Sequence, residues 1–485
     1  MAPPSIDGEE ISSLPGAVKC LEVRADLAGD LDADWLRSHF KGNLLYTLRS
    51  KAEGGSFEGS GQERRRRLLK SGKNYDLIDL EGDRDLLPEI LGEIPPHKRL
   101  ISWQGPAADA AALKQKLEKC SAVEARIYKL APMSKQPGDE MAVLSLLKHA
   151  GRGDLIAYST GKSSFWSRLI APRLGLPMIF GTIRKYAGAS EEPTVSQLIE
   201  DYDLPRLAPV SEIYGIVGDP VQHSLSPRLH NAAYRALGYP ALFVPFHAES
   251  FSDFWRDVVE EGTLESLGIL MMGFTVSSPH KETALKEVKA ISPMVQRAGS
   301  TNIFVRNNGT WKADTTDPEG VVEAMRRRGI ELKGKNVAVV GCGGSGRAIA
   351  AALDQAGARV TLVNRGLERG HHAVELLGLP FVPLSEFSVN GYSLIVNATP
   401  VGRDNGDLPF KVKGLGQGAA IVDLVYGDNP TPLISSAHSL GSTTVDGREV
   451  LFLQVRRQFH LMTGKEMPAD LALKILGMKP LRAGS

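Results

Sequence analysis

The chain has 485 residues, which is too many for a single hydrophobic core and predicts about three structural units. Hydrophobic residues make up 42% of it and charged residues 23%, values that are typical of soluble globular proteins. Its 57 Lys and Arg residues nearly balance its 56 Asp and Glu residues. Net charge therefore gives no reason to expect binding to nucleic acid or to an anionic membrane.

Between Ala17 and Ile183, short aliphatic and β-branched runs alternate with stretches of helical character. The runs are VKCLEVR, NLLYTLR, YDLIDLE, RLISWQ, EARIYKL, DLIAYST and LPMIFGT. They are mostly apolar throughout, as expected for parallel strands covered on both faces. The repetition predicts an α/β domain over 1–204, a TIM-like (β/α) barrel with its chemistry at the carboxyl ends of the strands. Seven strands are one fewer than usual, so the first βα unit is apparently missing.

A basic block and a proline-bearing segment punctuate this first half. Arg64 to Arg67 precede two leucines and are interpreted as the solvated face of a helix. Residues 205–211 are the predicted linker. Beyond it we expect a substrate-binding domain at 212–330, a nucleotide-binding Rossmann domain at 331–446, and C-terminal helices at 447–485 that return to the substrate lobe.

The stretch NVAVVGCGGSG predicts a buried strand that turns through a glycine loop into a helix. Glycines at Gly341, Gly343, Gly344 and Gly346 allow backbone N–H groups to approach a pyrophosphate at the helix N-terminus. The next strand ends in Asn364 and Arg365, where an NAD site normally has Asp or Glu. A planar cation there suits a 2′-phosphate, so the sequence favours NADP as the cofactor.

Other polar residues lie at the predicted strand ends. Ser224 and Ser226 suit a carboxylate ligand, but the same pattern is typical of an ordinary turn and helix cap. Lys281 and Asp317 come from separate strand ends and are able to form a proton-handling pair. Taken alone, such residues are more often merely solvated.

The order of these motifs resembles the shikimate dehydrogenase family over nearly all of 211–485. The strings that carry the resemblance are GDPVQHSLSPRLHNAAY, TVSSPHKE, STNI, TTDPEG, GCGGSGRAIA, VNR, NATPVG, DLVYGDNPTPL and GREVLFLQ. The resemblance implies reduction of 3-dehydroshikimate to shikimate with NADPH, without a metal. It also implies a place in the shikimate pathway of aromatic amino acid biosynthesis.

The family's roles transfer to matching positions of this chain. Ser224 and Ser226 bind the substrate carboxylate, and Lys281 and Asp317 form the catalytic pair. The ring hydroxyls are held by Asn302, Tyr426 and Gln454, and NADP by the glycine loop, Asn364, Arg365, Asn397 and Thr399. Ser277 stands where the family has threonine, which favours looser discrimination between shikimate and quinate. Arg403 replaces the family's methionine near the nicotinamide.

The first half resembles type I 3-dehydroquinate dehydratase through LEVRAD, TLRSKAEGG, DLIDLE, ISWQG and YKLAPMS. The resemblance implies that Lys129 forms a Schiff base with 3-dehydroquinate. It also implies substrate contacts from Glu22, Arg24, Arg49 and Arg168, a positioning role for Glu53, and a lid serine at Ser190. The family's catalytic histidine is Gln104 here, and an amide has no basicity near neutral pH.

Three functions therefore stay open. The chain is a bifunctional enzyme that converts 3-dehydroquinate to shikimate, a shikimate or quinate dehydrogenase with a catalytically inactive barrel, or a non-catalytic metabolite sensor. The retained Lys281 and Asp317 argue against the sensor, whereas Gln104 argues for the inactive barrel.

Three cysteines, far apart and without CxxC spacing, argue against a zinc site or disulfide framework. The first ten residues lack the apolar core of a signal peptide. No apolar run approaches the ~20 residues of a membrane helix. We therefore expect a cytoplasmic protein that binds small-molecule substrates, not nucleic acid or membranes; the sequence predicts no oligomeric state.

Overall fold

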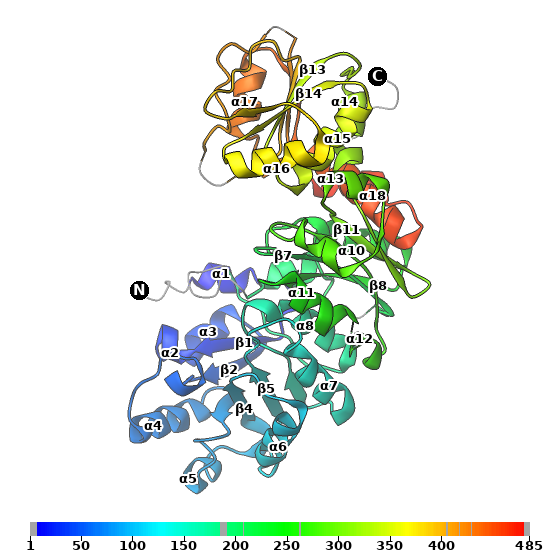
Figure 1. Cartoon of the computed structure of the whole chain (residues 1–485). Helices are drawn as coiled ribbons and strands as arrows, with labels where there is room; N and C mark the ends of the chain where they lie inside the picture. Colours follow the sequence, from blue (N-terminus) through cyan, green and yellow to red (C-terminus); the bar gives the residue numbers. More distant parts are fainter. Residues whose placement is uncertain are drawn as a thin grey trace. The chain divides into compact units, whose positions relative to one another are not determined.

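The computed structural model describes residues 7–184, 192–206, 208–260, 263–403, 406–416, 418–427 and 429–479 (Figure 1). The chain divides into two compact units. The first comprises Met1–Ser211 with Val244–Glu249 and Asp253–Leu270, and the second comprises Glu212–Phe243, Ser250–Ser252 and Met271–Ser485. The exact domain boundaries predicted from the sequence remain predictions.

The first unit is built on one parallel sheet whose strands follow the order of the sequence. The strands are β1 (Cys20–Arg24), β2 (Asn43–Thr47), β3 (Leu77–Glu81), β4 (Arg99–Gly105), β5 (Ile127–Pro132) and β6 (Leu155–Ala157). Every residue of β3 and β5 is buried, so both faces of the sheet are covered. This confirms the predicted α/β class and explains why the strands are apolar throughout.

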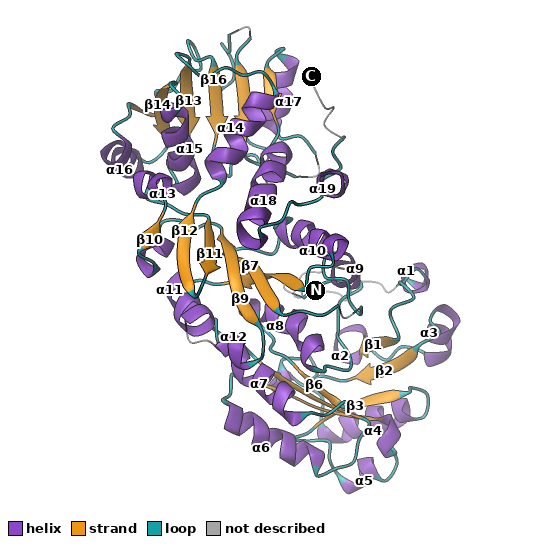
Figure 2. Cartoon of the chain, turned by 90° about the vertical axis from the view of Figure 1, so that its right-hand side faces the viewer, coloured by secondary structure: helices purple, strands orange, loops and turns teal. Residues whose placement is uncertain are grey.

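Helices connect and cover these strands (Figure 2). They are α1 (Gly8–Ser12), α2 (Ala25–Ala28), α3 (Ala33–His39), α4 (Gly61–Gly72), α5 (Pro88–Leu91), α6 (Ala110–Ser121), α7 (Glu140–Ala150), α8 (Phe165–Ile170) and α9 (Val195–Glu200). Among their N-caps, Asp109 accepts a hydrogen bond from the N–H of Ala112 and Ser60 accepts one from Glu63. Such caps satisfy backbone donors that the first helical turn leaves free.

The prediction of a seventh strand at Leu176–Thr182 is wrong. Only Thr182 pairs, through a single parallel bridge to Thr194. Pro177 lacks the N–H that a ladder requires, and the segment lines a cavity instead. Within the described residues the sheet is therefore an open half-barrel with β1 and β6 at its edges. The absence of a first βα unit stays a prediction.

The basic block also differs from its prediction. It does lie in a helix, α4, but the side chain of Arg64 is only 5% exposed. Its guanidinium donates to both carboxylate oxygens of Asp85 at 2.7 and 2.6 Å. The solvated interpretation is therefore wrong for Arg64, because an acidic partner 21 residues away neutralises it inside the protein.

The second unit contains a mixed sheet with the order β10-β12-β11-β9-β7-β8. Its strands are β7 (Glu212–Gly218), β8 (Ala241–His247), β9 (Leu270–Val276), β10 (Ala290–Ile291), β11 (Ile303–Asn307) and β12 (Thr310–Asp314). β11 runs antiparallel to both neighbours. The helices of the second unit that accompany this sheet are α10 (Ser226–Leu237), α13 (Pro293–Ala298), α14 (Asp317–Arg327), α18 (Gly447–Thr463) and α19 (Ala469–Ile475). The residues of β8 and of α11 (Phe251–Phe254) are divided between the two units, and α12 (Thr263–Ser266) belongs to the first. α18 packs against α14, α10 and β11, although it comes after the third sheet in sequence.

The third sheet is wholly parallel, with the order β15-β14-β13-β16-β17-β18. Its strands are β13 (Asn336–Val340), β14 (Arg359–Asn364), β15 (Phe381–Pro383), β16 (Leu394–Asn397), β17 (Ala420–Asp423) and β18 (Thr443–Val445). The order reverses between β13 and β16. Ligands of doubly wound sheets bind in the crevice at the carboxyl end of such a reversal. The predicted Rossmann domain is confirmed.

Alternating residues of β13 reach opposite faces of this sheet. Val337 and Val339 join a core with α15 (Gly344–Gln355), whereas Ala338 and Val340 join a core with α17 (Pro432–Ser439). α16 (Leu367–Leu377) packs on β14 and β15. Helices thus cover both faces, and the loops at the strand ends are left to form a site.

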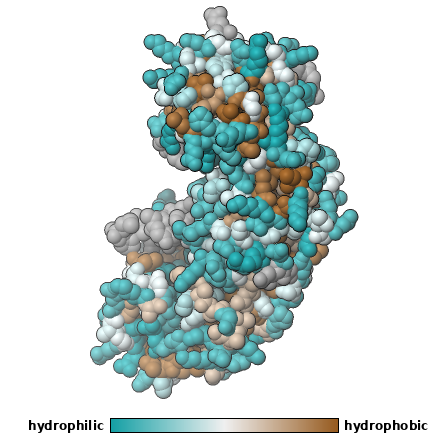
Figure 3. All heavy atoms as spheres, viewed as in Figure 1, coloured by the Kyte–Doolittle hydropathy of each residue, from teal (hydrophilic) through white to brown (hydrophobic). Residues whose placement is uncertain are grey.

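Hydrophilic side chains cover most of the face drawn in Figure 3, interrupted by hydrophobic patches. The exposed large hydrophobic residues come from many different elements, for example Leu237, Leu367 and Leu440. Within the described ranges, none of the helices has the length and apolar character needed to span a membrane.

Candidate active sites

The second unit brings Lys281 and Asp317 into direct contact. Lys281 follows β9, and Asp317 is the first residue of α14. The lysine Nζ donates to Asp317 Oδ2 at 2.6 Å. The carboxylate is nearly buried, while the lysine side chain is 20% exposed. An ammonium–carboxylate pair open on one side is able to deliver a proton to a bound small molecule.

Two predicted residues hold the other oxygen of this carboxylate. Asn302 Nδ2 donates to Asp317 Oδ1 at 2.8 Å, and Gln454 Nε2 donates to the same atom at 2.9 Å. The side-chain oxygen Oδ1 of Asn302 in turn accepts a hydrogen bond from the backbone N–H of Thr316 at 2.8 Å. Four residues thus converge from the segment after β9, the position just before β11, α14 and α18, although they span 173 positions from Lys281 to Gln454.

One contact of Lys281 was missed by the sequence analysis. Its Nζ also donates to the hydroxyl of Ser345 at 2.7 Å. Ser345 lies in the first turn of α15, between Gly344 and Gly346. A serine inside a glycine loop gives no sequence signal of a partner 64 positions earlier.

The predicted carboxylate-binding serines, Ser224 and Ser226, lie where the chain passes from β7 into α10, and Ser277 follows the neighbouring strand β9. Ser224 Oγ accepts from the backbone N–H of Ser226 at 3.2 Å, just where α10 begins. Ser277 follows β9, and a Cβ on Gly218 at the end of β7 would come within 2.9 Å of the Ser277 Cβ. β7 and β9 are adjacent in the sheet, so these serines lie at one edge of it.

The glycine loop is shaped by close contacts. Gly341 has a φ of +107°, which disfavours any residue with a Cβ. A Cβ on Gly346 would lie 1.8 Å from the Gly341 carbonyl oxygen, and one on Gly344 would lie 2.9 Å from the Lys281 Cβ. Nothing lies within 4 Å of a Cβ on Gly343. Three of the four glycines are therefore sterically required.

The end of β14 provides the predicted phosphate-facing residues. Asn364 Oδ1 accepts from the backbone N–H of Cys342 in the glycine loop at 3.0 Å, and Arg365 is exposed beyond it. A second cation, Arg369, follows in the first turn of α16. Burial raises the pKa of Cys342 to about 11, and the charges of Arg347 and Arg369 oppose that rise. The positive charges of Arg347 and Arg369 therefore act on Cys342 in the glycine loop.

Asn397 and Thr399 shape the loop across the crevice. Asn397 is fully buried, and its Nδ2 donates to Asp423 Oδ1 at 2.9 Å. Its Oδ1 accepts from the backbone N–H and hydroxyl of Thr399 at 3.1 and 2.7 Å. The Asn397 side chain is thus committed to holding the loop. The loop itself lies beside the Gly341 turn, where a Cβ would lie 2.9 Å from the Thr399 methyl.

These features fit a dinucleotide with a 2′-phosphate. The glycines leave space for close backbone approach, α15 points its N-terminus at the crevice, and Arg365 offers an exposed guanidinium. Tyr426 follows β17, and burial raises the pKa of its phenol above the usual value of 10 against the opposing charge of Arg403. Tyr426 is therefore a neutral hydrogen-bonding group.

The first unit holds a cavity of about 830 Å³. Six predicted residues line it: Glu22, Arg24, Arg49, Gln104, Lys129 and Arg168. Lys129 extends from β5, is 6% exposed, and places its Nζ 4.3 Å from the centre of the Phe180 ring. Six Lys and Arg residues and three Glu residues line the cavity, and this excess of positive charge is suited to an anionic small molecule.

Several of the cavity cations already have partners. Arg24 donates to both oxygens of Asp26 at 2.9 and 2.8 Å. Arg168 donates to the Phe180 carbonyl oxygen at 3.2 Å and lies over the Tyr158 ring. Glu22 accepts from the hydroxyl of Thr47 at 2.7 Å. These contacts orient the side chains along the cavity wall.

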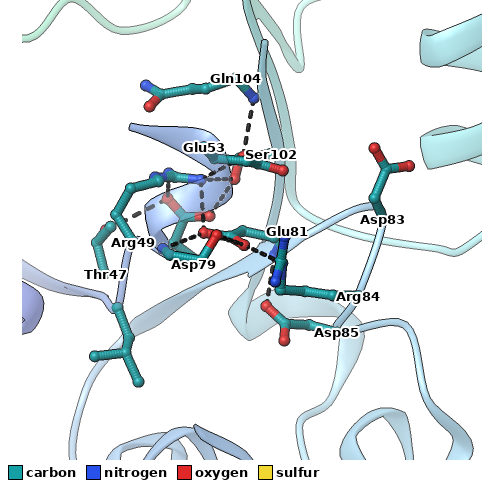
Figure 4. A network of polar contacts seen from close by, with 12 residues as sticks. Thr47, Arg49, Glu53, Asp79, Glu81, Asp83, Arg84, Asp85, Ser102 and Gln104 are labelled. Atoms are coloured by element: carbon teal, nitrogen blue, oxygen red, sulfur yellow. Dashed lines mark hydrogen bonds and ion pairs between the residues drawn. The ribbon is translucent and has the colours of Figure 1, made fainter. Parts of the chain in front are cut away.

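Arg49 lies in a buried polar network (Figure 4). Its Nη1 donates to Glu53 Oε2 and to the Ser102 hydroxyl, both at 2.9 Å, and its Nη2 binds Asp79. Glu81 is a further carboxylate partner at 3.5 Å. Arg49 is therefore largely committed to the surrounding acidic groups, which limits its predicted contact with a substrate.

Glu53 lies next to Gln104, the position at which the resemblance predicts a histidine. Its Oε2 accepts from the backbone N–H of Gln104 at 2.9 Å, whereas its Oε1 is buried and has no hydrogen-bond partner among the described residues. Burial, followed by the charge of Glu81, raises the pKa of Glu53 to about 8. The predicted lid residue Ser190 lies outside the described residues.

In the part of the chain that the structure describes, no group of His, Cys, Asp and Glu residues has the arrangement of a metal site. The three cysteines, Cys20, Cys120 and Cys342, are free thiols.

Comparison with known proteins agrees with this two-part organisation. Residues 7–207 match the type I 3-dehydroquinase family model, and residues 216–304 match the model of the shikimate dehydrogenase substrate binding domain. The two resemblances predicted from the sequence are thereby confirmed.

Individual relatives cover either the whole chain or its second half. The chain is 27% identical over 500 residues to a bifunctional 3-dehydroquinate dehydratase/shikimate dehydrogenase, chloroplastic, of Arabidopsis thaliana, covering 94% of this chain and 81% of that protein. It is 34% identical to a shikimate dehydrogenase (NADP(+)) of Geobacter sp. strain M21, covering 57% of this chain and 98% of the relative.

A crystal structure of a shikimate dehydrogenase in complex with NADP+ is 27% identical, with a TM-score of 0.50. The match covers 56% of this chain and 98% of that one.

Proposed function

Because the chain belongs to the shikimate dehydrogenase family, we propose that its second unit reduces 3-dehydroshikimate to shikimate with NADPH. The observation that carries this proposal is the Lys281–Asp317 contact of 2.6 Å beside the glycine loop. NADP, when bound, supplies the hydride. The chain supplies the proton and the binding groups.

Lys281 donates a proton to the carbonyl oxygen of the substrate as negative charge develops there. Asp317 holds the ammonium in place through Oδ2, and its Oδ1 is held by Asn302 and Gln454. In shikimate oxidation the same pair accepts the hydroxyl proton. Ser224 and Ser226 bind the carboxylate at the other end of the ring, which fixes the reacting carbon relative to Lys281.

Selectivity for NADP comes from Arg365, whose planar guanidinium binds a 2′-phosphate in bidentate fashion. Asn364 holds the glycine loop through the backbone N–H of Cys342, and Asn397 holds Thr399 at the end of β16. The Lys281–Asp317 pair argues against a non-catalytic sensor. NADP+-dependent oxidation of shikimate by the purified chain tests the proposal. Comparing its rates with shikimate and quinate tests the looser discrimination expected of Ser277.

For the first unit we propose a site that binds 3-dehydroquinate. Lys129, Arg24 and Arg168 line one cavity, which suits a carboxylate-bearing ketone with the lysine amine as nucleophile. Conversion to 3-dehydroshikimate would make the chain bifunctional. Gln104 supports the alternative of an inactive barrel, and dehydration of 3-dehydroquinate without NADPH distinguishes the two.

The finer organisation of the chain is also part of the proposal. We place a barrel-like domain at 1–204, a linker at 205–211, a substrate lobe at 212–330 with 447–485, and a nucleotide lobe at 331–446. We further propose a cytoplasmic protein. The Arabidopsis relative is named as chloroplastic, so fluorescent tagging in the native cell is the relevant test.

A further inference from the structure

Ser345 connects the nucleotide loop to the proton donor. An ammonium group has three N–H donors. In Lys281, one donates to Asp317 Oδ2 at 2.6 Å and one to Ser345 Oγ at 2.7 Å. The remaining donor is the one left for a substrate oxygen. We propose that Ser345 is a positioning residue that orients the Lys281 ammonium and thereby couples proton transfer to the nucleotide-binding loop.

The backbone around this contact is equally close. A Cβ on Gly344 would lie 2.9 Å from the Lys281 Cβ and 3.0 Å from the Ser300 Cβ. The Ser300 hydroxyl donates to the Gly344 carbonyl oxygen at 2.8 Å, and the N–H of Thr301 donates to the Lys281 carbonyl oxygen at 2.8 Å. The glycine loop is therefore packed in direct contact with the segment that carries Lys281.

The same helix also binds the neighbour of Lys281. Arg347, two residues after Ser345, is fully buried and pairs with Glu282 at 3.2 Å. Its Nε donates to the Ala298 carbonyl oxygen at 2.8 Å. The first turn of α15 thus contacts the neighbour of Lys281, Glu282, through Arg347. It contacts the ammonium group of Lys281 itself through Ser345.

This arrangement has a functional consequence. Asp317 alone leaves the ammonium free to rotate about one contact, whereas Asp317 and Ser345 together direct the third N–H. Because Ser345 belongs to the loop that receives the dinucleotide, a displaced loop also displaces the proton donor. The chain is thereby built to protonate substrate only when its nucleotide lobe is in place.

The test is the variant Ser345→Ala, measured by NADP+-dependent shikimate oxidation in the full chain. A hydrogen bond to a charged group is lost, so we expect kcat to fall about tenfold and the pH profile of kcat to shift. The KM for shikimate changes little, because the carboxylate serines are untouched. Ser345→Thr keeps the hydroxyl and is expected to restore both the rate and the profile.

Ser300→Ala is the matched control. It removes another hydrogen bond to the same loop, yet leaves both Lys281 contacts in place, so its pH profile should match that of the wild type. If Ser345→Ala raises only the KM for NADP+ and leaves kcat and the profile unchanged, Ser345 serves nucleotide binding alone and the inference is overturned. The inference rests on the proposed function, and an inactive wild type would instead reject that function.

Discussion

Glu53 accepts a hydrogen bond from the backbone N–H of Gln104 at 2.9 Å, while its other oxygen is buried and has no partner among the described residues. The resemblance predicts a histidine at position 104, and an imidazole N–H there would be a donor for this carboxyl oxygen. The glutamine side chain lines the cavity but is unable to exchange a proton near neutral pH. The relationship links the sequence change at Gln104 to a specific gap in the hydrogen bonding of the site.

Replacement of Gln104 by histidine should restore the missing base. An imidazole N–H can donate to Glu53 Oε1 while the other nitrogen handles the substrate proton. We expect Gln104→His to raise the rate of 3-dehydroquinate dehydration by about 100-fold or more. The ultraviolet absorbance of the conjugated product measures this rate. Gln104→Asn, which has no basic group, is the control. Equal rates in the wild type and both variants would show that the lack of a base at position 104 does not limit dehydration in this cavity.

Selectivity for NADP should depend on the exposed guanidinium at the end of β14. Arg365→Ala removes the charge proposed to bind the 2′-phosphate, so we expect the KM for NADP+ to rise about tenfold or more. NAD+ lacks that phosphate, and its KM should change little. Initial-rate kinetics with both cofactors measure the difference. Equal increases for the two would place Arg365 outside the phosphate site.

The glycines of the loop should differ sharply in their tolerance of a methyl group. In Gly346→Ala the new Cβ meets the Gly341 carbonyl oxygen at 1.8 Å, so NADP+ binding should be lost or the fold weakened. In Gly343→Ala the Cβ meets no described protein atom within 4 Å, and φ is already −74°, so the fold should tolerate it and any loss of NADP+ binding comes from the space left for the dinucleotide. Thermal unfolding compares the stability of the two variants, and cofactor titration by fluorescence measures their binding. Equal thermal stability of both variants would contradict the loop geometry.

His230 should make the second unit sensitive to acid. It is fully buried and stacks on Phe243 at 4.2 Å, and burial lowers its pKa from 6.5 to about 3. Below pH 6.5 the unfolded chain binds a proton that the folded chain refuses until about pH 3. The contribution of the neutral His230 to the free energy of unfolding is therefore fully present above pH 6.5, and it is lost progressively as the pH decreases towards 3.

Between pH 7 and pH 5 this group should cost the wild type roughly 2 kcal/mol of unfolding free energy. His230→Phe keeps a stacked ring without a titrating group. On going from pH 7 to pH 5, the free energy of unfolding of the variant should therefore increase relative to that of the wild type by that amount. Denaturant unfolding at both pH values measures it. An unchanged difference would mean that His230 is protonated in the folded protein.

Sequence patterns predicted the elements that depend on local chemistry. The mostly apolar strands β3 and β5 and the glycine turn at Gly341 each follow from residues close together in the chain. Contacts between distant residues were not predictable in this way. Arg64 was predicted to be solvated because nothing in the sequence near it indicates a contact with Asp85. Ser345 was not predicted as a site residue because its partner, Lys281, is 64 positions away.

The predicted site residues differ in the same respect. The meeting of Lys281, Asn302, Asp317 and Gln454 was expected only through resemblance to a family, since spacing alone does not bring four residues of different elements together. The seventh strand failed because an apolar run containing Pro177 satisfied the pattern without the N–H donors that a sheet requires.

The most direct measurement is the rate of NADP+-dependent shikimate oxidation by the wild type, Lys281→Ala and Asp317→Asn, with Lys286→Ala as an exposed-lysine control. The account predicts an active wild type and control. Both site variants should lose about 100-fold or more in kcat while their affinity for NADP+ is retained. Turnover by Lys281→Ala and Asp317→Asn at the wild-type rate would contradict the assignment of this pair as the proton-transfer site.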